Sequence, residues 1–336
     1  MKNHIIFFSG GKSSFSVADW VKTNYPDDNI LLYFTDTMWE NDDLYRFIYQ
    51  AADRMQLPML THANGLNPIE LMFEKKLVYN SRIGDCSKLL KMKVSRDFLK
   101  KGIEPPVVKW RNREYLKQED FVTDATLYFG IGWDEEHRAG PIKKNWQPFE
   151  VVFPMIDELI DNAATLKKYD LRQPVLYDLG FTHNNCNGRC VKGGQGHHRN
   201  LKEKMPDEFK KLMEQEHHLK VCVDAYRFIK KIPAGEIDEE ERQYRYDEID
   251  DAYRDYFYGR ADKPKMYIPP AASIDSTMSE HPAFTTYSFM KKTAGGDNKP
   301  YPLRQLNSDV ESEDTQIDLF DIGGCGCSVD FGEWNE

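Results

Sequence analysis

The chain opens with Met1-Lys2-Asn3-His4-Ile5-Ile6-Phe7-Phe8-Ser9-Gly10-Gly11-Lys12-Ser13-Ser14, and this segment predicts the architecture of the first half of the chain. Residues 4–8 form a short apolar run, which predicts a buried first strand. Small residues follow at 9–14, and residues 15–23 have helical spacing. A strand, a tight loop and a helix in direct succession are typical of an alternating α/β fold.

The loop between this strand and this helix predicts a phosphate-binding site. Small residues let the backbone approach a charged oxygen closely, and the first turn of the helix offers unpaired N–H groups. The residues predicted to bind the nucleotide cofactor are Ser9, Gly10, Gly11, Lys12, Ser13 and Ser14. A Walker loop is excluded because Ile6 stands where its first glycine is needed. An ordinary glycine-rich turn remains the alternative.

Strand-like and helix-like segments continue to alternate through the first half of the chain. Apolar strand-like segments lie at 29–34, 58–61, 125–131 and 150–153, and helical patterns at 42–55, 68–77 and 87–101. This alternation predicts a Rossmann-like parallel sheet with helices on both faces, and a mainly helical part behind it. We expect a nucleotide-binding α/β domain over 1–160, a helical domain over 161–260, and an irregular region over 261–336.

Composition excludes several classes of protein. The chain has 336 residues and a formal net charge of -10, which argues against a globally basic nucleic-acid-binding surface and leaves a local basic groove open. It lacks an apolar run of roughly 18 residues and a signal peptide, so neither membrane insertion nor secretion is expected. Six cysteines are too few for a disulfide scaffold, so a cytoplasmic location is expected.

The loop resembles the PP-loop of ATP pyrophosphatases, the adenine nucleotide alpha-hydrolase-like superfamily, whose pattern is Ser-Gly-Gly-x-Asp/Thr-Ser. The chain is most similar to the phosphoadenosine phosphosulfate reductase-like branch. Further segments resemble that branch in order along most of the chain: Thr35-Asp36-Thr37-Met38-Trp39-Glu40, Cys86-Ser87-Lys88-Leu89-Leu90-Lys91, Gly130-Ile131-Gly132-Trp133-Asp134-Glu135-Glu136-His137-Arg138, Phe153-Pro154-Met155 and His183-Asn184-Asn185-Cys186-Asn187-Gly188-Arg189-Cys190-Val191-Lys192. One departure is Ser13, which stands where Asp or Thr is usual.

The resemblance implies an enzyme that binds ATP with magnesium and releases AMP and pyrophosphate. Lys12 and Lys91 are candidate counter-charges for the phosphates, and Arg138 is a candidate fork-shaped donor. Candidate ligands for magnesium or for orienting the substrate are Asp36, Asp134 and Glu135. Glu136 and His137 are expected to be solvent-exposed.

The clustered cysteines predict a metal centre. Cys186-x3-Cys190 lies in a polar turn, and Cys325-x-Cys327 lies among glycines close to the last residues of the sequence. Four thiolates can hold zinc or an iron–sulfur cluster, while two unrelated pairs of free thiols are the alternative. Cys86 resembles a cluster position of the sulfonucleotide reductases, so the resemblance implies an iron–sulfur cluster, with zinc as the second choice.

Three functions compete. The first is an ATP-dependent adenylating enzyme in sulfur transfer to a nucleobase or nucleic acid, with a nucleotide or nucleic-acid acceptor and a sulfur-donor protein as partners. The second is a sulfonucleotide reductase, although the reductases' C-terminal Glu-Cys-Gly-Leu-His is reduced here to a Cys-Gly core at Cys325. The third is a nucleotide-binding module without catalysis, which the intact loop with Asp36, Glu135 and Arg138 disfavours.

Overall fold

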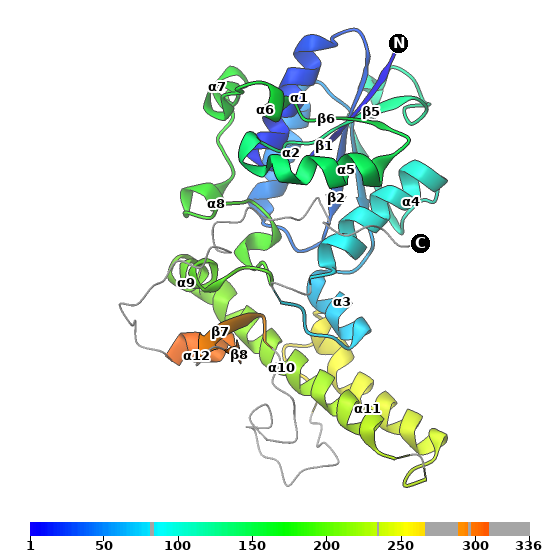
Figure 1. The fold of residues 1–336 in the computed structure, drawn as a ribbon, viewed down its shortest axis with the longest axis vertical. Coiled ribbons are helices and arrows are strands. Elements are labelled where there is room, and N and C mark those ends of the chain that lie inside the picture. The colour runs from blue at the N-terminus through cyan, green and yellow to red at the C-terminus, as the bar shows by residue number, and fades with distance from the viewer. Residues whose placement is uncertain (81–83, 234, 266–287, 295–296, 309–336) are drawn as a thin grey trace. The chain divides into compact units, whose positions relative to one another are not determined.

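A computed structural model describes residues 1–80, 84–233, 235–265, 288–294 and 297–308. The chain forms two compact units (Figure 1). As far as they are described, unit 1 comprises Met1–Asn67 and Asp85–Cys190, and unit 2 comprises Pro68–Gly84 and Val191–Ile322. Cys325 and Cys327 lie outside the described residues, as does most of the region predicted to be irregular.

Unit 1 is built on a six-stranded sheet in the order β4-β3-β2-β1-β5-β6. All neighbouring strands are parallel except β4, which pairs antiparallel with β3. The strands are β1 (Asn3–Phe7), β2 (Asn29–Asp36), β3 (Met59–Ala63), β4 (Val107–Arg111), β5 (Ala125–Tyr128) and β6 (Glu150–Val152). The expected α/β class, with a mostly parallel sheet between helices, is therefore confirmed.

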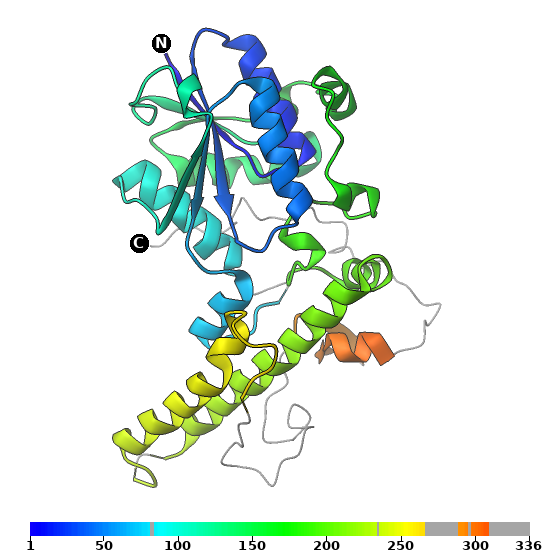
Figure 2. The same cartoon turned by 180° about the vertical axis from the view of Figure 1, so that it is seen from behind.

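Alternate residues of the strands feed two separate cores. Ile6 and Leu32 pack against α1 (Lys12–Asn24) and α2 (Asp42–Met55) on one face. Ile5 and Leu31 pack on the other face, against α4 (Lys93–Lys101) and α5 (Ala139–Trp146). Figures 1 and 2 show these two helix pairs on opposite sides of the sheet. Because side chains alternate along a strand, an apolar run such as 4–8 requires cover on both faces.

Short elements join the strands of unit 1 and carry most of the polar motifs. They are a π-helix (Ser87–Met92), 3-10 helices at Arg113–Tyr115, Trp133–Arg138 and Cys186–Gly188, and the helices α6 (Pro154–Asp157), α7 (Asn162–Lys168) and α8 (Val175–Asp178). Residues 161–190 cluster with the sheet. The long helix expected at 87–101 therefore consists of a π-helical turn followed by α4.

Unit 2 is mainly helical. It comprises α3 (Pro68–Lys75), α9 (Gln195–Lys204), α10 (Pro206–Lys231), α11 (Glu239–Phe257), the hairpin β7 (Met290–Ala294) and β8 (Asp297–Tyr301), and α12 (Leu303–Ser308). The buried carboxylate of Glu216 on α10 accepts the backbone N–H groups of Phe289 at 2.8 Å and Leu303 at 2.7 Å. These two bonds tie the hairpin and α12 to the long helix. Among the described residues, no helix is both long and apolar enough to cross a bilayer.

Candidate functional site

The loop predicted to bind phosphate lies at the point where the strand order of the sheet reverses. It joins β1 to α1, and β1 is flanked by β2 on one side and β5 on the other. In open α/β sheets, ligands bind outside the carboxyl ends of strands at such a switch point. Gly11 is the N-cap of α1 and gives no side-chain cap. Among the described residues, no acceptor reaches the N–H groups of Ser13 and Ser14.

Both the backbone conformation at position 10 and the side chains packed around it require glycine there. Its φ is +80°, in the left-handed region that glycine adopts without steric cost. A Cβ atom there would lie 2.9 Å from Cγ of Leu44 and 3.0 Å from Cγ2 of Ile48, both on α2. The loop therefore turns tightly against α2, and the Ser14 hydroxyl closes the turn by donating to the Gly11 carbonyl at 3.0 Å.

Gly130, which follows β5, crosses the same loop at close range. A Cβ atom on Gly130 would lie 2.6 Å from the backbone nitrogen of Ser14 and 2.8 Å from the carbonyl carbon of Ser13. Contacts below 3.0 Å to backbone atoms cannot be relieved by a rotamer change. The glycine that opens the Gly130–Arg138 motif therefore lets the segment after β5 pass directly against the backbone of Ser13 and Ser14.

Asp36 ends β2 at the same edge and is buried. Its Oδ1 accepts the N–H of Met38 at 2.7 Å and the hydroxyl of Tyr45 at 2.9 Å. Burial and the nearby Asp36 carboxylate raise the pKa of Tyr45, which holds the phenol in its donating form. Two donors thus orient the carboxylate through one oxygen, and no described residue donates to the other.

Glu40 joins three segments in a buried polar cluster. Its side chain is 0% exposed and its Oε1 lies 3.8 Å from Nζ of Lys91, which is 6% exposed. Oε1 also accepts the hydroxyl of Thr37 at 2.8 Å, and Oε2 accepts the N–H of Cys186. Lys91, predicted as a counter-charge for phosphate, therefore has a carboxylate partner inside the protein.

The turn that carries Cys186 and Cys190 has left-handed backbone and packs against the segment after β2. Cys186, Asn187 and Gly188 have successive φ values of +57°, +50° and +69°, and left-handed backbone is costly for Cys186, whereas Asn and Gly tolerate it. Asn41 donates to Asn187 at 2.6 Å. The Arg189 guanidinium carbon lies 4.5 Å from the Trp39 ring centroid. The segment after β2 therefore holds the cysteine turn in place.

Cys86, Cys186 and Cys190 are all buried, and none of them forms a disulfide within the described part of the chain. A hydrogen bond with Cys190, burial and the Glu40 carboxylate raise the pKa of Cys186, so its thiol is protonated at neutral pH. Within the ranges that the structure describes, no group of three or more His, Cys, Asp or Glu residues could hold a metal ion. These thiols alone do not make a cluster site, and Cys325 and Cys327 lie outside those ranges.

The remaining predicted catalytic residues lie on the 3-10 helix Trp133–Arg138. Arg138 is buried and its Nη1 donates to Glu135, three residues earlier. Its Nε has no hydrogen-bond partner among the described residues. Asp134 is exposed, as are Glu136 and His137. Arg138 thus pairs with Glu135, and Asp134 and Glu136 are the exposed acids of this helix.

Two residues that sequence analysis missed reach the loop from residues 172–184. The hydroxyl of Tyr177 accepts the N–H of Lys12 at 3.4 Å, and the Lys12 ammonium lies 4.2 Å from the centre of the Tyr177 ring. Nδ2 of Asn184 donates to the Gly10 carbonyl at 3.1 Å. Asn184 belongs to the His183–Lys192 motif, which could have pointed to it. Tyr177 carries no motif signal.

An open cavity of about 520 Å³ adjoins the loop at Lys12. It is walled by the segment from Leu159 to Ala163, by Leu166 of α7 and by Gln173. This volume lies within the range of small-molecule pockets.

The structure thus connects the loop at Ser9–Ser14 through Asn184 to the cysteine turn, and that turn through Glu40 to Lys91. Asp36 lies four residues before Glu40, and Gly130 connects the Asp134–Arg138 helix to the loop. Cys86 directly precedes the π-helix that carries Lys91. No protein-family model matches the sequence, and no curated protein is similar enough to match it.

Proposed function

We propose that this chain is an ATP-dependent adenylating enzyme with a Rossmann-like fold of the PP-loop type. The observation that carries the proposal is the pair of N–H groups, from Ser13 and Ser14, that no described acceptor claims at the first turn of α1. They lie at the sheet's switch point, where Gly10 and Gly130 bring backbone segments close together. Such a helix terminus binds phosphate through its N–H groups and its positive dipole end.

The length of the loop favours cleavage next to the α-phosphorus over transfer of the terminal phosphoryl group. Phe8, Ser9, Gly10 and Gly11 separate β1 from α1, which is shorter than the Walker loop that encircles the β-phosphate. A short loop can hold the terminal pyrophosphate and leave the α-phosphorus open to an acceptor oxygen. The expected products are AMP, carried first on the acceptor, and pyrophosphate.

Magnesium fits the residues at the edge of the sheet. One oxygen of Asp36 is oriented by Met38 and Tyr45, and the other is not claimed by a described donor. Magnesium in nucleotide sites is held by one or two carboxylates together with phosphates, so Asp36, with Asp134 as the accessible second acid, suffices. When bound, magnesium neutralises charge that develops on the leaving pyrophosphate.

Of the three cationic side chains predicted to neutralise phosphate, one has no carboxylate partner among the described residues, and two are paired with carboxylates. Lys12 lies in the first turn of α1, and its ammonium rests on the Tyr177 ring without a carboxylate partner among the described residues. Lys91 is paired with Glu40 and Arg138 with Glu135. Lys12 is therefore the cation best placed to neutralise the leaving pyrophosphate. Lys91 and Arg138 instead hold Glu40 and Glu135 in place.

The position of the cysteine turn supports sulfur transfer as the purpose of adenylation. Asn184 contacts the phosphate loop, and Cys186 follows it by two residues. An activated acceptor bound at the loop would thus lie near a thiol, and a nucleobase or nucleic acid with a separate sulfur-donor protein fits this arrangement. A sulfonucleotide reductase fits less well, because the C-terminal Glu-Cys-Gly-Leu-His of the reductases is reduced here to a Cys-Gly core at Cys325.

The test is equilibrium binding of ATP, adenosine and inorganic pyrophosphate to the purified protein with magnesium, measured by titration calorimetry. ATP and pyrophosphate should bind competitively, and ATP should bind far more tightly than adenosine, because the loop recognises phosphate. Equal affinity for ATP and adenosine would refute phosphate recognition by the loop. The position of cleavage then separates adenylation from a kinase-like reaction, because adenylation yields AMP and a kinase yields ADP.

A further inference from the structure

Tyr177 occupies an unusual place for a tyrosine on a four-residue helix. Its hydroxyl lies 3.4 Å from the N–H of Lys12, longer than an ordinary hydrogen bond. It would lie 3.1 Å from a Cβ atom at Gly11. Burial raises the pKa of this phenol, so it carries its proton at neutral pH. No acceptor among the described residues takes that proton, so the hydroxyl has a donor to offer directly over the phosphate loop.

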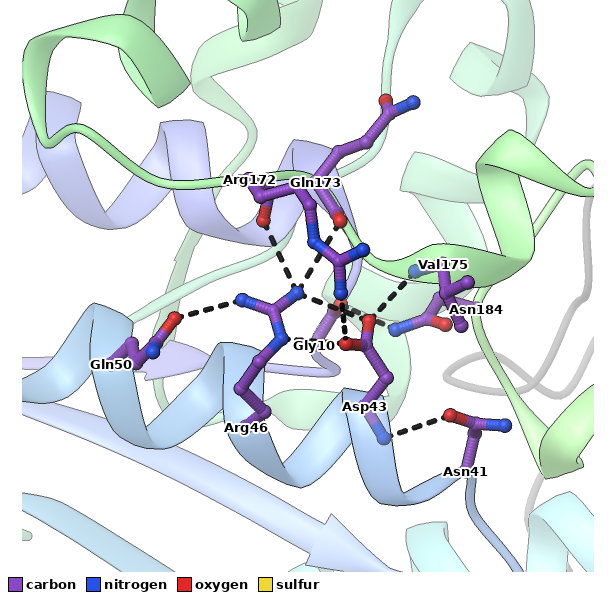
Figure 3. Close-up of polar contacts among 9 residues, drawn as sticks. All are labelled: Gly10, Asn41, Asp43, Arg46, Gln50, Arg172, Gln173, Val175 and Asn184. Atoms are coloured by element: carbon purple, nitrogen blue, oxygen red, sulfur yellow. Dashed lines mark hydrogen bonds and ion pairs between the residues drawn. The ribbon is translucent and has the colours of Figure 1, made fainter.

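An ionic clamp holds the segment that carries Tyr177 (Figure 3). Oδ1 of Asp43 accepts from Arg46 at 2.6 Å and from Arg172 at 2.7 Å, and Oδ2 accepts the N–H of Val175 at 2.7 Å. Arg46 also donates to the carbonyls of Arg172 and Gln173. Burial opposes ionisation of Asp43, but these hydrogen bonds outweigh it and lower its pKa. The clamp therefore fixes α8 above the loop before any ligand arrives.

Asn184 supplies a second, independent sign that this region faces a ligand. Its Nδ2 donates to the carbonyl of Gly10, as Figure 3 also shows. Its Oδ1 has no partner among the described residues although Asn184 is only 2% exposed. A buried acceptor without a donor costs about 1–3 kcal/mol, so a native protein rarely keeps one without a use.

We propose that Tyr177 and Asn184 are direct ligands of the nucleotide bound at the phosphate loop. The proposal rests on the proposed function and names the residues that complete its site from outside the loop motif. Phosphate oxygens accept hydrogen bonds, so the Tyr177 hydroxyl donates to a phosphate oxygen beside the N–H of Lys12. Asn184 does the reverse: its Oδ1 accepts from a hydroxyl or a bound water of the ligand.

Titration calorimetry of ATP onto the Tyr177→Phe variant tests the first ligand. A hydrogen bond to a charged oxygen contributes enough for about a tenfold loss of affinity when the hydroxyl is removed. The matched control is Tyr169→Phe, which removes a phenol that donates to Asp19 on α1 at 2.7 Å. The assignment would be overturned if the Tyr177→Phe variant bound ATP within twofold of the parent, or more tightly. Either result would mean that the Tyr177 hydroxyl only accepts the N–H of Lys12 and so competes with phosphate for it.

Asn184→Asp tests the second ligand and remains informative if Tyr177→Phe does not fold. The substitution keeps the shape and places a negative charge beside Gly10, so affinity for ATP and for pyrophosphate should fall more than tenfold while adenosine binding stays unchanged. Equal losses for all three ligands, or losses accompanied by a matching fall in the urea unfolding midpoint from the lost Nδ2 bond to Gly10, would mean that Asn184 is only structural. If the parent itself binds neither ATP nor pyrophosphate, the proposed function fails; if the parent binds and both variants bind equally well, only this inference fails.

Discussion

Replacing Gly130 by alanine adds one methyl group at the point where the segment after β5 crosses the loop at Ser9–Ser14. The new Cβ would lie 2.6 Å from the nitrogen of Ser14, whereas ordinary contact begins near 3.4 Å. The difference, about 0.8 Å, has to be absorbed by backbone, because both neighbours are main-chain atoms of Ser13 and Ser14.

The added methyl group has two effects of different size. Overpacking of this kind costs about 1–3 kcal/mol of folding free energy, which leaves most domains folded. A displacement of about 1 Å at the first turn of α1 matters more to the ligand, because the N–H groups have to converge on one phosphate and such misplacements cost on the order of 100-fold in activity. We therefore expect a modest fall in stability and a loss of ATP affinity of tenfold or more.

The assay compares Gly130→Ala with Gly140→Ala by urea unfolding and by ATP titration. Gly140 lies on α5, and a Cβ atom there meets nothing within 4 Å. Its substitution should leave ATP binding unchanged and stabilise the helix by about 0.5–1 kcal/mol. If Gly130→Ala binds ATP as tightly as the parent while remaining folded, the N–H groups of Ser13 and Ser14 do not bind phosphate.

Three further outcomes are expected. Gly11→Val should abolish ATP binding, because its side chain enters the space below the Tyr177 hydroxyl, which lies 3.1 Å from the first added carbon; retained affinity in calorimetry would contradict this. Cys186→Ser should remove iron or zinc from anaerobically purified protein in metal analysis, and a parent free of both metals would defeat the metal prediction. Burial raises the pKa of Glu216 from 4.5 to about 7. Its contribution to the free energy of unfolding is therefore present in full below pH 4.5 and is lost as the pH rises through 7. The loss amounts to about 3 kcal/mol. Urea midpoints should therefore fall between pH 5 and 8, and Glu216→Gln should flatten that slope; an unchanged slope would show that Glu216 does not titrate there.

Local patterns in the sequence were enough to predict the five mutually parallel strands of the sheet and the loop after β1. The apolar run at β1, the small residues behind it and the periodicity of α1 and α2 each carry their own signal, because buried parallel strands leave continuous apolar runs and amphipathic helices leave a periodic pattern. The edge strand β4 was missed. It contains Lys109 and Arg111 and is largely exposed, and thus lacks the apolar run that marks the central strands.

The parts of the site that sequence could not reveal depend on contacts between distant segments. Asn184 meets Gly10 across 174 positions and Lys12 meets Tyr177 across 165. Neither pairing leaves a periodic trace. For Lys91 the sequence motif predicted a counter-charge for phosphate. The fold shows in addition that Glu40 lies beside Lys91 in a buried ion pair, which the motif did not reveal.

The most direct test of adenylation is the position at which ATP is cut. Purified protein is incubated with magnesium and ATP labelled in the α- or the γ-phosphate, with water as acceptor, and the products are separated by anion-exchange chromatography. Cleavage next to the α-phosphorus predicts AMP and pyrophosphate in equal amounts, and neither product from the Gly11→Val variant. ADP with orthophosphate, or AMP formed equally by the variant, would contradict adenylation at the Ser9–Ser14 loop.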